Sequence, residues 1–274
     1  MKLALGSRTV LSRDASAEAS RTVERLGRCG LVARGVVYGV IGALSIGLAI
    51  GAGGRTESQT GALRTIAHQP LGTAALVLVA IGLAGYALWR LLEAARGVDS
   101  GKPASAGKRA SALGSGVAYS ALCAIAVEIL AGSRPSGGGA RTAAAGVLGW
   151  PGGPVYVAVA GVLLLGAGLY QGYQGIARTF LEDSEVGRMS PETRRSFTAL
   201  GVAGHVARGV IFLLIGYGVL RAALDYSPRR AVGLDGALQE LVHASYGPIL
   251  LGVVAAGFIC FALYSIADAR YHRI

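Results

Sequence analysis

Apolar residues gather along this chain in long blocks, which are separated by stretches rich in charged, polar and glycine residues. A helix needs about 20 apolar residues to cross the hydrocarbon core of a bilayer, because each residue adds about 1.5 Å. Six blocks have about that length: residues 29–50, 71–92, 112–131, 154–176, 200–224 and 248–267. Their apolar residues do not alternate with polar ones as barrel strands require. The pattern therefore predicts an all-α membrane protein with six transmembrane helices.

The connections between the blocks also carry a pattern. GALRTIAH (61–68) and GALQELVH (236–243) are amphipathic and too polar to span, so they predict short helices on the outer membrane surface. The corresponding stretch GSRPSGGGARTAAAG (132–146) is glycine-rich and predicts a plain loop. Ser190, Pro191 and Glu192 predict the start of a helix that runs into the fifth block, since they fit its cap and first turn.

One unit occurs three times. GLVARGVVYGVIG (30–42) and GHVARGVIFLLIG (204–216) are near-copies, and SALGSGVAYSALC (111–123) aligns with them. The ends of the units also match, as YALWRLLEA (86–94) and FALYSIADA (261–269) show. Each unit holds two spans, so all three insert with the same orientation. Parallel repeats of this kind predict a pseudo-threefold axis along the membrane normal.

The predicted organisation follows from these units. It comprises an N-terminal cytoplasmic tail (1–25), repeat 1 (26–97), a basic linker (98–109), repeat 2 (107–178), a cytoplasmic linker (179–199) and repeat 3 (200–274).

The net charge of +11 is distributed unevenly. The tails and linkers on one side hold most of the lysines and arginines. The opposite connections hold only Arg55, Arg64, Arg134, Arg141, Arg221, Arg229 and Arg230. By the positive-inside rule, this asymmetry predicts a multi-pass protein of the inner (cell) membrane with both termini in the cytoplasm. The basic surface then faces anionic lipid rather than nucleic acid.

Composition and motifs narrow the chemistry. Charged residues make up 15% of the chain, against about 25% in a soluble domain. The cysteines Cys29, Cys123 and Cys260 all fall in predicted spans without disulfide or metal spacing. HExxH, GxSxG, Walker and CxxC motifs are all missing from the sequence. We therefore expect no enzyme of a known type, no metal and no cofactor.

The repeats also resemble a known family. The Arg-Gly pair near the start of a unit and its aromatic-then-acidic end resemble the bacterial membrane proteins catalogued as domain of unknown function twelve-oh-six, in which a two-helix unit occurs three times. The resemblance covers nearly the whole chain after residue 24. Repeat 2 departs from it, with Ser115 in place of the arginine and Gln174 in place of the acid. The resemblance implies a six-span fold and no activity.

Ionisable residues inside spans are the first candidates for function, because each costs several kcal/mol unless it is paired. Arg34 and Glu93 fall at comparable depths in repeat 1, as do Arg208 and Asp268 in repeat 3. Repeat 2 has the polar pair Ser115 and Gln174 there. One interpretation is an ion pair that clasps each hairpin, Arg34 with Glu93 and Arg208 with Asp268. The other is that the arginines face the axis and meet an anionic solute.

Three further residues belong with this set: Glu128, Arg221 and Gln171. Glu128 lies in an apolar run at the depth of Arg221, which makes an ion pair between them one interpretation and a proton- or cation-linked carboxylate the other. Gln171 and Gln174 should face protein or water rather than lipid.

Two functional hypotheses follow. The first is a channel or transporter for a small ion or solute that passes between the repeats. The second is a non-transporting membrane scaffold or accessory subunit, in which oligomerisation or a protein partner would carry the function. Lipid is the partner common to both.

Overall fold

The computed structural model describes residues 3–99, 102–103, 105–133 and 139–272, and the side chains within 25–97, 105–133 and 139–272. Its long helices are α1 (Leu3–Ala49), α3 (Gly72–Arg96), α4 (Ala106–Leu130), α6 (Gly153–Ala177), α7 (Pro191–Leu224) and α9 (Gly247–Tyr271). The short helices are α2 (Gln59–Ala67), α5 (Ala140–Leu148) and α8 (Leu234–His243). The remaining elements are β1 (Val98–Asp99), β2 (Lys102–Pro103) and the 3-10 turns η1 (Thr179–Asp183), η2 (Val186–Arg188) and η3 (Pro228–Arg230).

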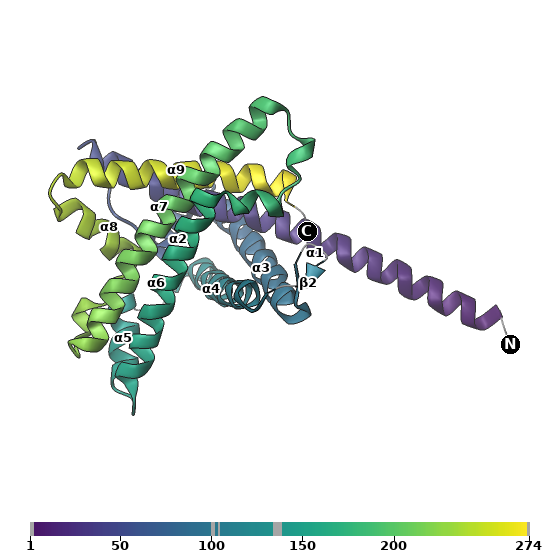
Figure 1. Cartoon of the computed structure of the whole chain (residues 1–274), viewed down its shortest axis with the longest axis horizontal. Coiled ribbons are helices and arrows are strands. Elements are labelled where there is room, and N and C mark those ends of the chain that lie inside the picture. Colours follow the sequence, from purple (N-terminus) through teal and green to yellow (C-terminus); the bar gives the residue numbers. More distant parts are fainter. Residues whose placement is uncertain (1–2, 100–101, 104, 134–138, 273–274) are drawn as a thin grey trace.

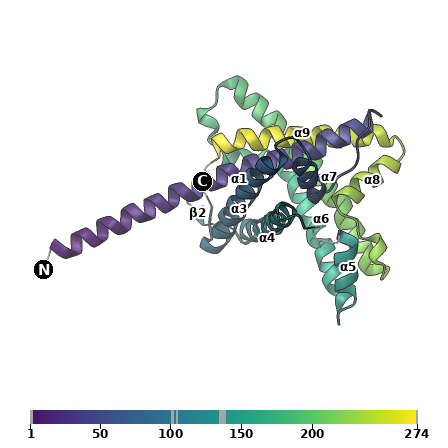
Figure 2. The same cartoon turned by 180° about the vertical axis from the view of Figure 1, so that it is seen from behind.

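The six predicted spans are confirmed. Six described helices are long and apolar enough to cross a membrane, and each overlaps one predicted block. The first helix starts earlier than the block, because α1 already begins at Leu3, within the predicted tail. The first half of α1 stands away from the other helices (Figures 1 and 2).

The two predicted short helices are confirmed as α2 and α8, but the loop predicted in repeat 2 is wrong. Residues 140–148 form α5, whose sequence ARTAAAGVL contains four alanines, the strongest helix former. Every repeat therefore has a short helix between its two spans. The start of α7 is confirmed too, since the Ser190 Oγ accepts a hydrogen bond from the Thr193 N–H at 3.2 Å.

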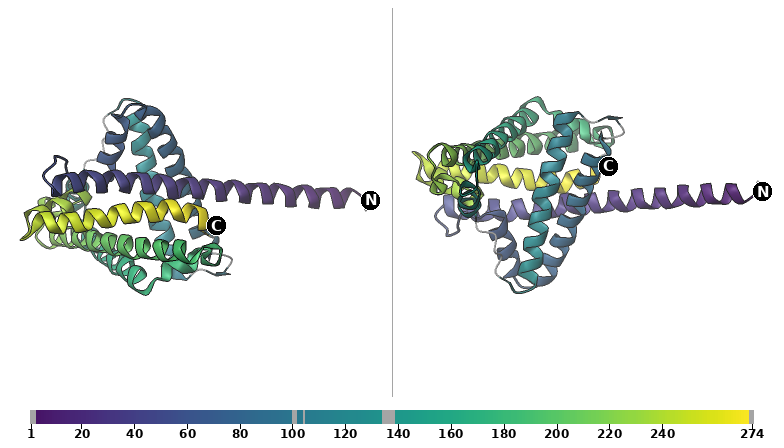
Figure 3. Two further views of the ribbon diagram at one scale, coloured as in Figure 1. Left: turned by 90° about the horizontal axis from the view of Figure 1, so that it is seen from above. Right: turned by 90° about the horizontal axis from the view of Figure 1, so that it is seen from below.

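The spans pack in an open row in the order α4, α3, α1, α9, α7 and α6. Within repeats 1 and 3 the two spans touch each other. Within repeat 2, α4 and α6 are not a packed pair and lie at the two ends of the row. Figure 1 shows α1 beside α9 and α6 beside α7 as two pairs running in different directions, and Figure 3 shows α3 and α4 running across α1 and α9. Each of these three pairs joins the second span of one repeat to the first span of another.

The three pairs share one contact pattern with a period of seven residues. On the second spans it consists of Ala80, Ala87 and Ala94 in α3, Gly161, Gly168 and Gly175 in α6, and Ala255, Ala262 and Ala269 in α9, all of them buried. On the first spans, glycines at matching positions face these residues. A Cβ atom added to Gly42 would lie 3.0 Å from the Ala255 carbonyl oxygen, and one added to Gly209 would lie 3.0 Å from the Gly168 carbonyl oxygen. Small residues thus bring the helix backbones close together.

The third pair follows the same pattern without glycine at one of the positions. Cys123 of α4 corresponds to Gly42 of α1, and its Sγ donates a hydrogen bond to the Ala80 carbonyl oxygen at 3.6 Å. Ala80 in turn corresponds to Ala255. Small-residue contact between repeats therefore recurs in all three pairs, although Gly116 of α4, which matches Gly35, lies closest to Leu91.

Candidate functional site

Arg34 lies on α1 and is held by hydroxyl groups and aromatic rings. Its Nε donates a hydrogen bond to the Ser265 Oγ at 2.8 Å, and one terminal nitrogen donates to the Tyr86 hydroxyl at 3.0 Å. Its Cζ lies 4.9 Å from the centroid of the Phe261 ring. Only 9% of the surface of Arg34 is exposed. Arg34 is thus sealed within the protein.

Arg208 lies at the matching position on α7 and is less enclosed. Its Cζ lies 4.4 Å from the Phe261 centroid, 5.3 Å from that of Tyr38 and 5.5 Å from that of Phe212. With the Gln171 amide oriented so that both its ends are satisfied, its oxygen accepts hydrogen bonds from both terminal nitrogens of Arg208 at 3.0 Å. The Nε of Arg208 is buried and has no hydrogen-bond partner in the part of the chain that the structure describes.

The two arginines share one aromatic ring, Phe261 of α9. Their Cζ atoms lie 4.9 and 4.4 Å from its centroid, so they cannot be further apart than the sum of these distances, about 9 Å. At that separation and an effective dielectric constant of about 20, two unit charges repel by about 2 kcal/mol. Among the described residues, neither guanidinium forms an ion pair with a carboxylate. The site therefore carries excess positive charge inside the spans.

The predicted ion pair of repeat 1 is wrong. Glu93 pairs instead with Arg90, whose terminal nitrogen lies 2.8 Å from its Oε2. Arg34 turns towards Ser265 in α9, a helix of another repeat. The prediction paired residues within a hairpin, whereas the most extensive contacts of α1 are with α9, across the boundary between repeats.

The predicted pair of repeat 3 is wrong as well. Asp268, 2% exposed, accepts a hydrogen bond from the Ser184 Oγ at 3.0 Å, and its Oδ2 lies 3.1 Å from the His272 Nδ1. Burial alone would lower the pKa of His272, but the negative charge and hydrogen bonding of Asp268 outweigh burial and raise that pKa above its usual value. Asp268 thus ties the end of α9 to the linker 179–199 rather than pairing with Arg208.

Pairing between helices of different repeats also accounts for the missing arginine of repeat 2. Arg34 meets Ser265, and Arg208 meets Gln171, at matching positions of the paired helices α1/α9 and α7/α6. The corresponding positions in the α4/α3 pair are Ser115 and Arg90. Each pair therefore has one arginine and one uncharged polar residue at this level, and in the α4/α3 pair the arginine has changed helix.

The remaining predicted residues are Arg221 and Glu128, which lie away from the two arginines, and the glutamines of α6, which lie beside Arg208. Arg221 pairs with Asp225 at 3.0 Å, and half-buried Glu128 forms no ion pair among the described residues, so the predicted Arg221–Glu128 pair is wrong. Their helices, α7 and α4, are not packed neighbours. Gln171 does face protein, and in the orientation that bonds Arg208 it also donates to the Gln174 Oε1 at 3.0 Å.

Gln174 continues this polar line by donating to the Tyr170 hydroxyl at 3.4 Å. A chain of hydrogen bonds thus leads from α7 to the surface of α6, through Arg208, Gln171, Gln174 and Tyr170. On its other side, Arg208 borders a cavity of about 100 Å³, large enough for several water molecules or a small anion. The cavity is lined by Tyr38, Gln59, Arg208, Ile211, Phe212, Ile215, Leu234 and Phe258.

Sequence reasoning missed the residues that hold the arginines. Tyr86, Phe261 and Ser265 lie on second spans and read as ordinary membrane-interface or packing residues. A comparison of position 34 with position 265, rather than with its own hairpin, would have exposed the exchange with Ser115 and Arg90. No three His, Cys, Asp or Glu side chains come together as a metal site within the described residues.

Comparisons with known proteins agree with the repeat architecture. The family model described as Domain of Unknown Function (DUF1206) matches three segments, residues 29–97, 110–178 and 203–272. The chain is also similar to "Uncharacterized protein YxxB" of Bacillus subtilis (strain 168), with 29% identity over 254 residues that cover 92% of each chain. No solved structure matches the chain.

Proposed function

This chain belongs to the Domain of Unknown Function (DUF1206) family, whose description carries no activity. We therefore propose its function from the arginine site, by which we mean Arg34, Arg208 and the Phe261 ring between them. The protein binds a small anion at Arg208 and passes it across the cell membrane. The chain is then a channel or transporter with both termini in the cytoplasm. The excess positive charge around Phe261 is the observation that carries the proposal.

The physical argument starts from cost. An arginine within a span is expensive, and two of them no more than about 9 Å apart without a paired carboxylate are more so. A bound anion would remove this repulsion and would give the unpartnered Nε of Arg208 a hydrogen bond. When the anion is absent, the Phe261 ring and the Gln171 amide would stabilise the guanidinium groups.

The surroundings of Arg208 support a route. The cavity beside it is lined by Gln59 of α2 and Leu234 of α8, from the connections predicted to lie on the outer side. The line from Gln171 to Tyr170 leads along α6 on its other side. Arg208 would then be the central binding position, between an outer cavity and a polar helix surface.

The three matching helix pairs support the arrangement of the route. Because α1/α9, α4/α3 and α7/α6 use matching small-residue contacts, we infer that they surround a pseudo-threefold axis along the membrane normal, in a ring that is open between α4 and α6. The arginine level of each pair would then lie at the same depth in the membrane.

A second candidate function is a non-transporting scaffold or accessory subunit. The contacts of Arg34 with Ser265, Tyr86 and Phe261 favour it, because a guanidinium group whose donors already bond the protein can stabilise helix packing without any ligand. Under this proposal the arginines would lock neighbouring repeats together, and no solute would cross.

Ion flux into proteoliposomes separates the two. Purified protein should pass small anions such as chloride or nitrate faster than empty vesicles do, and Arg208→Gln should lower that flux on the order of tenfold, since it removes the central charge. Arg208→Lys should retain part of it. Arg229→Gln is the matched control, because Arg229 is exposed on the predicted outer connection. Absence of flux for every anion tested, with folded protein in the vesicles, would leave the scaffold.

A further inference from the structure

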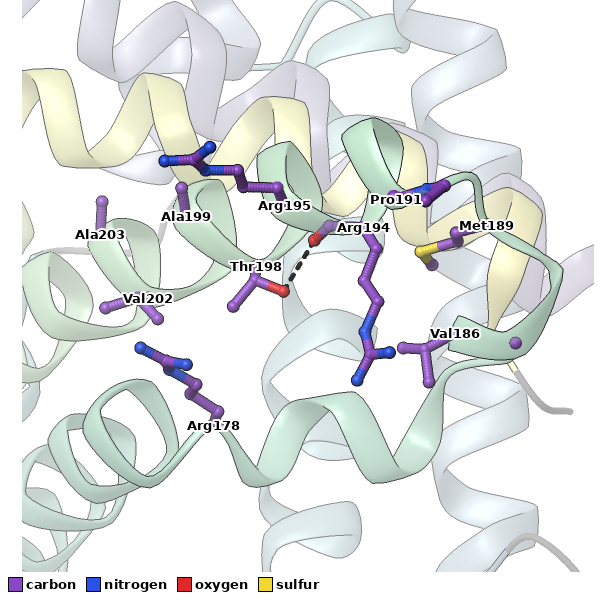
Figure 4. Close-up of a pocket in the computed structure, with 11 residues that line it drawn as sticks. Arg178, Val186, Met189, Pro191, Arg194, Arg195, Thr198, Ala199, Val202 and Ala203 are labelled. Atoms are coloured by element: carbon purple, nitrogen blue, oxygen red, sulfur yellow. Dashed lines mark hydrogen bonds between the residues drawn. The ribbon is translucent and has the colours of Figure 1, made fainter.

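A groove of about 900 Å³ opens between the end of α6 and the start of α7. Figure 4 shows Arg178 and Arg194 reaching into it from its two walls, whereas Arg195 turns away from them. The lining residues are Arg178, Val186, Gly187, Met189, Pro191, Arg194, Arg195, Thr198, Ala199, Val202 and Ala203. The groove lies apart from the arginine site, since it shares no lining residue with the cavity beside Arg208.

The charge of the groove is positive and unbalanced. Among the described residues, none of Arg178, Arg194 and Arg195 forms an ion pair with a carboxylate. The neighbouring acid Glu185 is already paired, with its Oε2 2.6 Å from a terminal nitrogen of Arg188. The Thr198 hydroxyl donates to the Arg194 carbonyl oxygen and is not available as a donor to a ligand. The guanidinium groups are therefore the groove's donors for an anion.

The rest of the lining is apolar. Val186 and Met189 come from the inner linker, and Ala199, Val202 and Ala203 come from α7. Charged groups beside an apolar strip suit a ligand that has a phosphate at one end and hydrocarbon at the other. A free phosphate would use only the first of these features.

The place of the groove along the spans suits the same ligand. α7 has 34 residues and is thus about 50 Å long, which exceeds the hydrocarbon core of about 30 Å. Its first turns, including Arg194, therefore extend into the headgroup layer. Arg178 caps the end of α6 at the same level and belongs to the side with more basic residues, which the positive-inside rule places in the cytoplasm.

We propose that this groove binds one anionic phospholipid of the cytoplasmic leaflet. Arg178 and Arg194 hold its phosphate by charge-assisted hydrogen bonds, and Val202 with Met189 contacts the first part of an acyl chain. Guanidinium groups suit this role because their planar donors match phosphate oxygens in pairs. The proposal does not depend on anion transport.

Lipid binding by the whole purified protein tests it. Delipidated protein in a neutral detergent is titrated with phosphatidylglycerol, phosphatidylcholine or inorganic phosphate, and bound lipid is counted by native mass spectrometry. We expect one tightly bound phosphatidylglycerol, with weaker binding of phosphatidylcholine. An arginine near a membrane surface contributes enough for about a fivefold change in affinity, so Arg178→Gln with Arg194→Gln should weaken binding about 25-fold.

Two further variants and the phosphate titration sharpen the result. Arg178→Lys with Arg194→Lys should keep most of the preference for phosphatidylglycerol, and Arg229→Gln should leave it unchanged. Equal binding of the two lipids to the wild type would overturn the proposal without any variant. So would phosphatidylglycerol binding that survives the double glutamine change. If inorganic phosphate bound as tightly as phosphatidylglycerol, the groove would be a phosphate site and not a lipid site.

Discussion

Two glycines of α6 allow a sharp test of the packing between repeats, because one faces α7 and the other does not. Gly161 and Gly166 lie on the same helix, five positions apart. A Cβ atom added to Gly161 would lie 2.7 Å from the Leu220 backbone nitrogen, whereas one added to Gly166 would have no other atom within 4 Å. Gly161→Ala and Gly166→Ala thus make the same chemical change at a close contact and at an open surface.

The magnitudes follow from these distances. The contact at Gly161 falls 0.7 Å short of the 3.4 Å at which ordinary van der Waals contact begins, and a backbone atom cannot turn away as a side chain can. The two helices must separate, and overpacking of this kind costs about 1–3 kcal/mol. At Gly166, alanine should instead stabilise the helix by up to about 1 kcal/mol through its higher helix propensity.

Equilibrium unfolding in mixed micelles with increasing dodecyl sulfate measures both changes. We expect the unfolding midpoint to fall for Gly161→Ala and to stay or rise for Gly166→Ala. Equal midpoints for the two variants would refute the reasoning, because they would mean that the α6/α7 contact does not depend on small residues.

Other predictions concern charge and orientation. Arg34→Gln should lower the free energy of unfolding by about 1–3 kcal/mol, since it removes charged donors from two buried hydroxyl partners, and the same micelle titration measures it. Because Asp268 raises the pKa of His272, the stability from this pair is complete at pH values below the usual histidine pKa and is lost as pH rises through the higher folded value. The unfolding midpoint should therefore fall with rising pH in the wild type and show less of this fall in His272→Gln. In a background without native cysteines, an impermeant maleimide should label Ser245→Cys in intact cells, but Ser196→Cys only after permeabilisation, and the reverse result would contradict the predicted orientation.

The exchange of Arg90 and Ser115 clarifies the role of the arginine level. If each helix pair needs one arginine there for packing, its position on either helix should serve. Moving it back, with Ser115→Arg and Arg90→Ser together, should preserve the fold better than Arg90→Ser alone. With Ser115→Arg measured alone as well, a double-mutant cycle would show that the two positions are coupled if the effects of the two changes do not add.

The sequence by itself determined the six long apolar helices and the threefold repetition of a two-span unit. These features depend on local hydrophobicity and on self-similarity, both of which can be read without knowing which helices touch. It also marked Arg34 and Arg208 as exceptional, because charge within an apolar block is visible at once. The short helix α5 was missed because the glycines before it obscured its alanine-rich start.

Only the tertiary structure decided the partners. The close pairs join helices of different repeats, such as α1 with α9, so Arg34 meets a residue more than 200 positions away as well as Tyr86 of its own hairpin. Arg34 consequently met Ser265, and Asp268 met His272 and Ser184. Periodicity gives the face of each helix but not the neighbour that covers it. Small residues at every seventh position allow the backbones of these three pairs to approach closely, and that fit becomes visible only when the helices are placed together.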